Sequence, residues 1–94
     1  MSLELIKKKI RAGEFYHRDH IYEKLDEINR MFFLNLEPED VELAILSGEL
    51  VETLDNDRRG RRYVIQGYAN ETLLEIICRI KGNVVIITVY LPYY

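Results

Sequence analysis

A short basic run is the first place where this sequence could do chemistry. The run holds four arginines within five residues, namely Arg58, Arg59, Arg61 and Arg62. A guanidinium is planar, stays charged at neutral pH and can hold two oxygens of one phosphate group. The run therefore predicts phosphate or RNA binding, with Arg79 of a later strand placed nearby. The alternative is that these arginines form exposed ion pairs with Asp55, Asp57 and other acids.

The only two histidines, His17 and His20, are the candidate proton-transfer groups. An imidazole gains and loses a proton near neutral pH. We expect His20 to open a helix and to act in proton transfer, and His17 to be an exposed polar residue. The alternative for His20 is a helix-start residue bonded to the backbone. Glu23 would add one ligand at helical spacing, but this set is weak for a metal, so we predict no metal ion.

The expected last strand adds two polar side chains, Thr88 and Tyr90. Alternation in a strand places them on one face with Ile86, while Val85 and Val89 occupy the other face with Ile87. A one-residue bulge would reverse part of this assignment. A tyrosine can donate a hydrogen bond and stack on a base, or simply pack at a sheet edge.

Charge is unevenly distributed along the chain, whose net charge is −3. Residues 1–30 carry a net +1, residues 31–57 a net −8 without any Lys or Arg, and residues 58–94 a net +4. Because a local field governs binding more than the total charge does, the last third could present a basic face to a polyanion. The alternative is that both charged regions are ordinary solvated surfaces.

Composition restricts the classes of protein and compartment. The single cysteine, Cys78, excludes an intrachain disulfide and a multi-cysteine zinc site, and it falls on the apolar side of a strand pattern. No apolar stretch approaches the ~18 residues of a membrane span, and the first residues do not resemble a signal peptide. We therefore expect a cytoplasmic protein that has no membrane partner.

Hydrophobic periodicity predicts one α+β domain covering residues 1–94. We expect three N-terminal helices packed on one face of a four-stranded antiparallel sheet. Ser2 caps the first helix, the second starts near Arg18 or Asp19, and Pro38 lies in the first turn of the third. Gly13 and Gly48 end the first and third helices. Residues 29–36 either extend the second helix or form an apolar connection. The expected strands are 49–54, 61–69, 73–80 and 84–91.

Taken in order, several short segments resemble a small bacterial and archaeal domain family grouped with RelE-type and BrnT-type ribonuclease toxins. The segments are 13–16, His20, 38–45, 48–52, 61–68 and 87–90. The resemblance implies a RelE-like fold and a toxin-like endoribonuclease that uses no metal and no cofactor. It also implies two partners, RNA and an antitoxin protein.

The resemblance assigns the catalytic positions to His20, Arg62, Thr88 and Tyr90. In the implied reaction a base activates the RNA 2′-hydroxyl, which attacks the adjacent phosphate. Arg62 would stabilise the charge building on phosphorus, and His20 would be the base or the acid. Tyr90 would donate a proton or stack on a base, and Thr88 would orient one of them. The sequence departs from the family pattern at Ile21 and at the pair Lys24-Leu25.

The alternative function is a non-catalytic module that binds a protein or forms a homodimer. This alternative rests on two apolar segments, residues 31–34 and the aromatic tail at residues 91–94. Exposed patches of this kind often mark interfaces.

Overall fold

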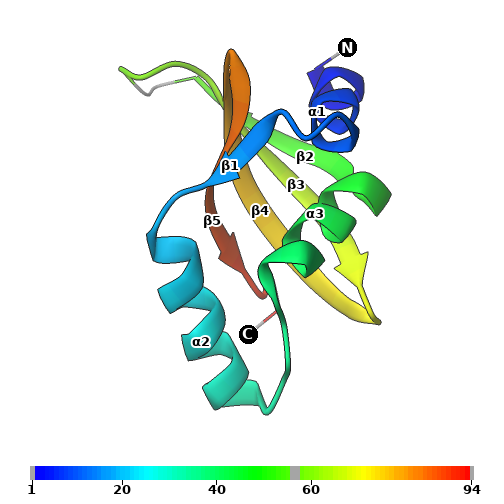
Figure 1. The fold of residues 1–94 in the computed structure, drawn as a ribbon, viewed down its shortest axis with the longest axis vertical. Coiled ribbons are helices and arrows are strands. Elements are labelled where there is room, and N and C mark those ends of the chain that lie inside the picture. The colour runs from blue at the N-terminus through cyan, green and yellow to red at the C-terminus, as the bar shows by residue number, and fades with distance from the viewer. Residues whose placement is uncertain (1, 56–57, 94) are drawn as a thin grey trace.

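A five-stranded sheet backed by three helices forms the architecture of the chain (Figure 1). The computed structural model describes residues 2–55 and 58–93. The elements in chain order are α1 (Ser2–Arg11), β1 (Phe15–His17), α2 (His20–Phe32), α3 (Pro38–Ser47), β2 (Glu49–Leu54), β3 (Arg62–Ala69), β4 (Thr72–Lys81) and β5 (Asn83–Tyr90). The prediction of an α+β chain with three helices is confirmed. The prediction of four antiparallel strands is wrong, because the sheet has five strands and is mixed.

Strand β1 is the element that the sequence did not predict. It pairs in parallel with β5 and forms one edge of the order β1-β5-β4-β3-β2. The Arg18 N–H donates to the Ile86 carbonyl at 3.0 Å, and the Val84 N–H donates to the Glu14 carbonyl at 2.9 Å, which extends the pairing at both ends. A strand of three residues is too short to show alternation, and its partner lies at the other end of the chain. No local pattern could therefore indicate it.

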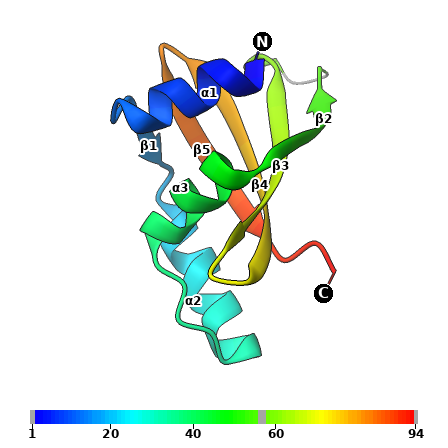
Figure 2. The same ribbon diagram turned by 90° about the vertical axis from the view of Figure 1, so that its right-hand side faces the viewer.

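The helices bury the apolar positions that their spacing predicts. Ile21, Leu25 and Ile28 of α2 are buried together, and α1 and α3 lie against one face of the sheet (Figure 2). Helix α2 continues to Phe32, so residues 29–32 extend the helix and residues 33–36 form the connection to α3. No helix among the described residues is long and apolar enough to cross a lipid bilayer.

A bulge in β5 changes the expected assignment of its faces. The register passes from Ile77 opposite Thr88 to Cys78 opposite Ile86, which leaves Ile87 without a partner in the register. Val84, Ile86 and Val89 therefore face the helices and are fully buried, so the expected grouping of Val85 with Val89 is wrong. Thr88 and Tyr90 lie on the opposite side of the sheet, called here the open face.

Candidate functional site

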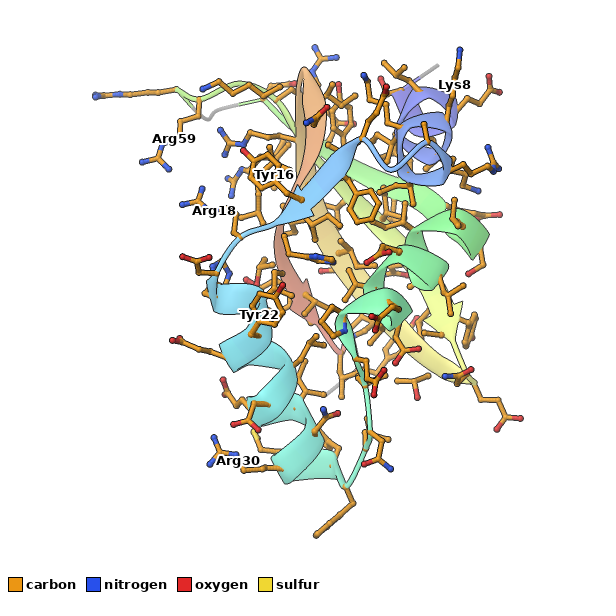
Figure 3. All side chains as sticks on the ribbon, viewed as in Figure 1. Lys8, Tyr16, Arg18, Tyr22, Arg30 and Arg59 are labelled. Carbon is orange, nitrogen blue, oxygen red and sulfur yellow. The ribbon has the colours of Figure 1, made fainter. Side chains whose placement is uncertain are left out.

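Four cationic side chains line one pocket at the β1 side of the open face. Figure 3 labels three of the lining residues, Tyr16, Arg18 and Arg59. The pocket has a volume of about 250 Å³ and is lined by Tyr16, Arg18, Arg59, Arg79, Lys81 and Val85. We call it the arginine pocket. Tyr16 pairs with Val85 and Val85 pairs with Arg79, so these three residues form one row across β1, β5 and β4.

The four cations of the arginine pocket come from three parts of the fold. Arg18 directly follows β1 and is held there by its N–H bond to Ile86. Arg79 is buried within β4, Lys81 ends that strand, and Arg59 reaches in from the β2–β3 loop. Among residues 2–55 and 58–93, no carboxylate lines this pocket. The arrangement creates a local positive potential that can bind an anion, although the chain is acidic overall.

His20 lies in a second hollow that adjoins the arginine pocket. This hollow is lined by residues 16–20 and shares Tyr16 and Arg18 with the pocket. His20 is exposed and is the first residue of α2, as predicted from the sequence. The fold therefore brings the candidate proton-transfer group beside the cations.

The other three proposed catalytic residues all lie on the open face, but at different places along it. Arg62 precedes Tyr63, which pairs with Cys78, so Arg62 lies beside Arg79 on the neighbouring strand. Thr88 is buried opposite Ile77 in β4.

Tyr90 lies further along the open face, opposite Glu75 of β4. Glu75 and Arg79 are four residues apart in that strand, a distance of roughly 13 Å. The structure thus groups Arg62 with the arginine pocket and separates both from Tyr90.

Tyr90 instead contacts α2. The Lys24 ammonium lies 5.0 Å from the centroid of the Tyr90 ring, within the range of a cation–π interaction. Lys24 follows His20 by one helical turn, so both residues share the side of α2 that faces Tyr90. Tyr90 and His20 therefore border the same side of the sheet from two elements.

The sequence offered two alternatives for the arginines of the basic run, phosphate binding and ion pairing with nearby acids, and these arginines differ in their surroundings. Arg59 lines the arginine pocket, whereas the Arg61 Nε donates to the Asp55 Oδ1 at 2.6 Å. This hydrogen bond, together with the charge of Asp55, raises the pKa of Arg61. Arg58 is exposed in the loop. The proposed partner Asp57 lies outside the described residues.

His17 differs from the expectation of an exposed polar residue. Its side chain is 11% exposed, and its Nε2 lies 3.1 Å from the Glu42 Oε2 of α3. Burial raises the pKa of Glu42, an effect that the charge of His17 opposes and that of Glu39 reinforces. His17 faces inward because it alternates with Tyr16 and lies opposite the buried Ile86.

The site residues that the sequence reasoning missed are Tyr16, Arg18 and Lys81. Tyr16 and Arg18 lie in or beside β1, whose partner β5 is distant in the sequence, so no local pattern points to them. Lys81 ends β4 beside the tight turn to β5, a position that reads from the sequence as an ordinary turn residue. The described residues contain no group of three or more His, Cys, Asp and Glu side chains that could hold a metal ion.

Comparison with known proteins gives one match. A family described as a domain of unknown function, DUF4258, matches residues 28–91. The matched span contains most of the sheet together with Arg59, Arg79 and Lys81, whereas Tyr16, Arg18 and His20 precede it. Searches of curated proteins and of solved structures gave no match.

Proposed function

The chain belongs to the DUF4258 family, a domain of unknown function, and within that family we propose that it binds RNA and cleaves it without a metal ion. The observation that carries this proposal is the arginine pocket, where four cations and an exposed tyrosine surround a space of about 250 Å³. An RNA chain offers both a phosphate for the cations and an unpaired base for the Tyr16 ring.

The proposed cleavage uses His20 at the edge of the arginine pocket. His20 removes the proton of the RNA 2′-hydroxyl, and the 2′ oxygen attacks the adjacent phosphorus while the bond to the 5′ oxygen breaks. The products are a 2′,3′-cyclic phosphate and a 5′-hydroxyl, and the Tyr16 hydroxyl would supply the proton of that 5′-hydroxyl. Arg79 and the neighbouring Arg62 offset the negative charge that develops on the phosphate oxygens.

Kinship with RelE-type and BrnT-type ribonuclease toxins is part of this proposal. It is supported by the order of the segments that resemble this group, with His20 opening a helix and the segment 61–68 forming most of β3, an interior strand of the sheet. Under this kinship an antitoxin protein would be encoded beside the chain. Thr88 and Tyr90 would then act by orienting the bound RNA rather than by touching the phosphate in the arginine pocket.

The binding test compares charge-removing variants at matched exposed positions. Arg18→Ala and Arg59→Ala are expected to weaken binding of a fluorescent single-stranded RNA about tenfold each, because each removes a charge-assisted contact. Lys8→Ala is the control, since Lys8 is an exposed cation of α1 far from this pocket (Figure 3). Fluorescence anisotropy measures the dissociation constants. Equal affinities for Arg18→Ala and Lys8→Ala would contradict RNA binding in the arginine pocket.

The cleavage test uses the same RNA in the presence of EDTA. His20→Ala is expected to keep the wild-type affinity and to lose cleavage by at least about a hundredfold, as removal of a general base does. Gel analysis with identification of the cyclic phosphate end measures the reaction. Equal cleavage by wild type and His20→Ala would indicate a contaminating nuclease and would overturn the catalytic assignment.

A further inference from the structure

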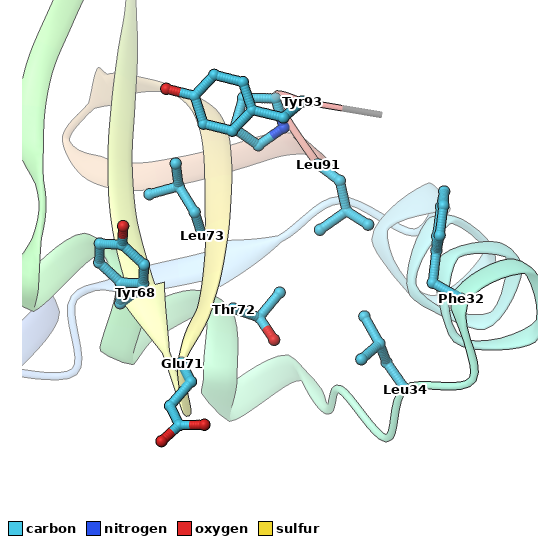
Figure 4. A pocket seen from close by; sticks show the side chains of 9 residues that line it. Phe32, Leu34, Tyr68, Glu71, Thr72, Leu73, Leu91 and Tyr93 are labelled. Carbon is cyan, nitrogen blue, oxygen red and sulfur yellow. The ribbon is translucent and has the colours of Figure 1, made fainter.

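The opposite end of the open face carries a groove made of two adjoining hollows, and Figure 4 shows the side chains that line the larger one. The larger hollow, of about 370 Å³, lies between the α2–α3 connection, the β3–β4 turn and the C-terminal tail. A second hollow of about 350 Å³ continues it toward β2. The side chains of Tyr68, Leu73 and Tyr93 line both hollows. We call the two hollows together the aromatic groove.

The aromatic groove joins parts of the two apolar segments that the sequence marks as interface candidates. Phe32 and Leu34 come from residues 31–34, and Leu91 and Tyr93 come from the tail. Tyr93 and Tyr68 remain 77% and 60% exposed, so much of this aromatic surface is in contact with water. A contiguous apolar surface of this kind on a small domain indicates an interaction site.

Charge distinguishes the aromatic groove from the arginine pocket. Two carboxylates, Glu71 and Glu49, line the hollows, and no Lys or Arg of the described residues does so. The arginine pocket has the reverse composition, with four cations and no described carboxylate. Phosphates would be repelled from the groove, whereas a segment with apolar side chains and positive flanks would be attracted.

Hydrogen bonds hold two walls of the aromatic groove in place, the α2–α3 connection and the β3–β4 turn. The Asn29 side chain donates to the Leu36 carbonyl at 2.9 Å and accepts from the Leu36 N–H at 2.8 Å, which fixes the connection that carries Leu34. The Asn70 Nδ2 donates to the Asp40 Oδ1 at 3.2 Å, which ties the turn that carries Glu71 to α3. A groove with fixed walls loses little conformational entropy on binding.

We propose that the aromatic groove docks a short segment of a partner protein, which presents two large apolar side chains flanked by Lys or Arg. One apolar side chain would enter each hollow, and the basic flanks would approach Glu71 and Glu49. This inference is independent of RNA binding, because it uses none of the residues of the arginine pocket.

In the test, a display library of short random peptides is selected for binding to the full chain, and the enriched peptides are sequenced. The expected peptides carry two large apolar residues with Lys or Arg beside them. A synthetic copy of the most enriched peptide then gives dissociation constants by anisotropy. Tyr93→Ala is expected to weaken its binding at least about tenfold and Glu71→Lys about fivefold, whereas Tyr16→Ala at the other end of the face leaves it unchanged.

Three results would overturn the docking proposal. The first is a selection without enrichment, or one that enriches peptides with acidic flanks. The second is equal binding of the enriched peptide to wild type and Tyr93→Ala, with equal thermal midpoints showing that both are folded. The third arises when no peptide is enriched and Tyr93→Ala has another effect. That effect is either a lower affinity for RNA or the dissociation of a homodimer. The third result would assign the groove to nucleobases or to a second copy.

Discussion

At the scale of single residues, the contact between His17 and Glu42 joins one strand of the candidate site to the helices. It links β1 to α3 at a distance of 3.1 Å and keeps His17 on the helix side of the sheet. Because side chains alternate along a strand, Tyr16 must then point to the open face, where it lines the arginine pocket. The inward side chain of His17 and the outward side chain of Tyr16 thus follow from one alternation along β1.

Glu42 makes folding depend on pH in a defined direction. Burial raises its pKa above the ordinary value of 4.5, so its contribution to stability is present below that pH and is lost as the pH rises through the raised value. We expect the unfolding free energy of wild type to fall relative to that of Glu42→Gln over this range. Urea titrations across a pH series measure the difference. A wild type that gains stability over the variant with rising pH would contradict the assignment.

Cys78 is expected to be chemically inert in the folded protein. Burial raises the pKa of its thiol to about 12, and its side chain is inaccessible to water, so almost no thiolate is present at neutral pH. A thiol reagent should label the chain in urea and leave it unlabelled under native conditions. Labelling at the rate of a free thiol without denaturant would show that β4 does not lie in the core.

Residue types alone predicted some members of the candidate site but not all of them. Arg59, Arg79 and His20 were expected from the side chains alone, because guanidinium and imidazole groups suit phosphate and proton chemistry. Arg18 and Tyr16 were not expected, since they reach the pocket only through the pairing of β1 with β5. Arg62 and Tyr90 were expected together, yet the register separates them along the sheet.

At the scale of elements, α3 lies very close to β3 where the two meet at Gly67. A Cβ at Gly67 would collide with the Ala44 carbonyl oxygen, so only glycine lets the helix lie this near to the strand. Gly48, which ends α3, is equally close to β3, since its added Cβ would lie 2.6 Å from the Gln66 carbonyl oxygen. These two glycines set the position of α3 on the sheet.

Gly67→Ala is therefore expected to lower the unfolding free energy by about 2–3 kcal/mol or more, because backbone atoms rather than a flexible side chain must move. Leu43→Ala, at an exposed position of α3, is the control and should change stability by less than about 0.5 kcal/mol. Denaturant unfolding of both variants measures the effect. Equal stability of Gly67→Ala and wild type would show that α3 does not pack on β3 as described.

The elements that the sequence predicted are those whose signals are local. Helix α3 follows from Pro38 at its start and Gly48 at its end, and β2 follows from its apolar and β-branched content. Strand β1 and the bulge at Ile87 depend on contacts between distant segments, which no local pattern encodes. These two features determine which side chains the open face presents.

At the scale of the whole molecule, opposite charges are divided between the two ends of one sheet face. The arginine pocket lies toward β1, and the aromatic groove, with Glu71 and Glu49, lies toward the β3–β4 turn and the tail. The sequence indicated a basic last third but could not show this division. The groove draws its residues from α2, β3, β4 and the tail, which only the fold brings together.

The salt dependence of RNA binding tests the central claim most directly. For single-stranded RNA the logarithm of the association constant falls with the logarithm of salt concentration by about 0.7 for each phosphate neutralised. Between about 50 and 200 mM salt, Arg18→Ala and Arg59→Ala should each reduce the slope by about 0.7, and Lys8→Ala should leave it unchanged. Slopes for the two pocket variants equal to that of wild type, or no measurable RNA binding by wild type, would contradict the account.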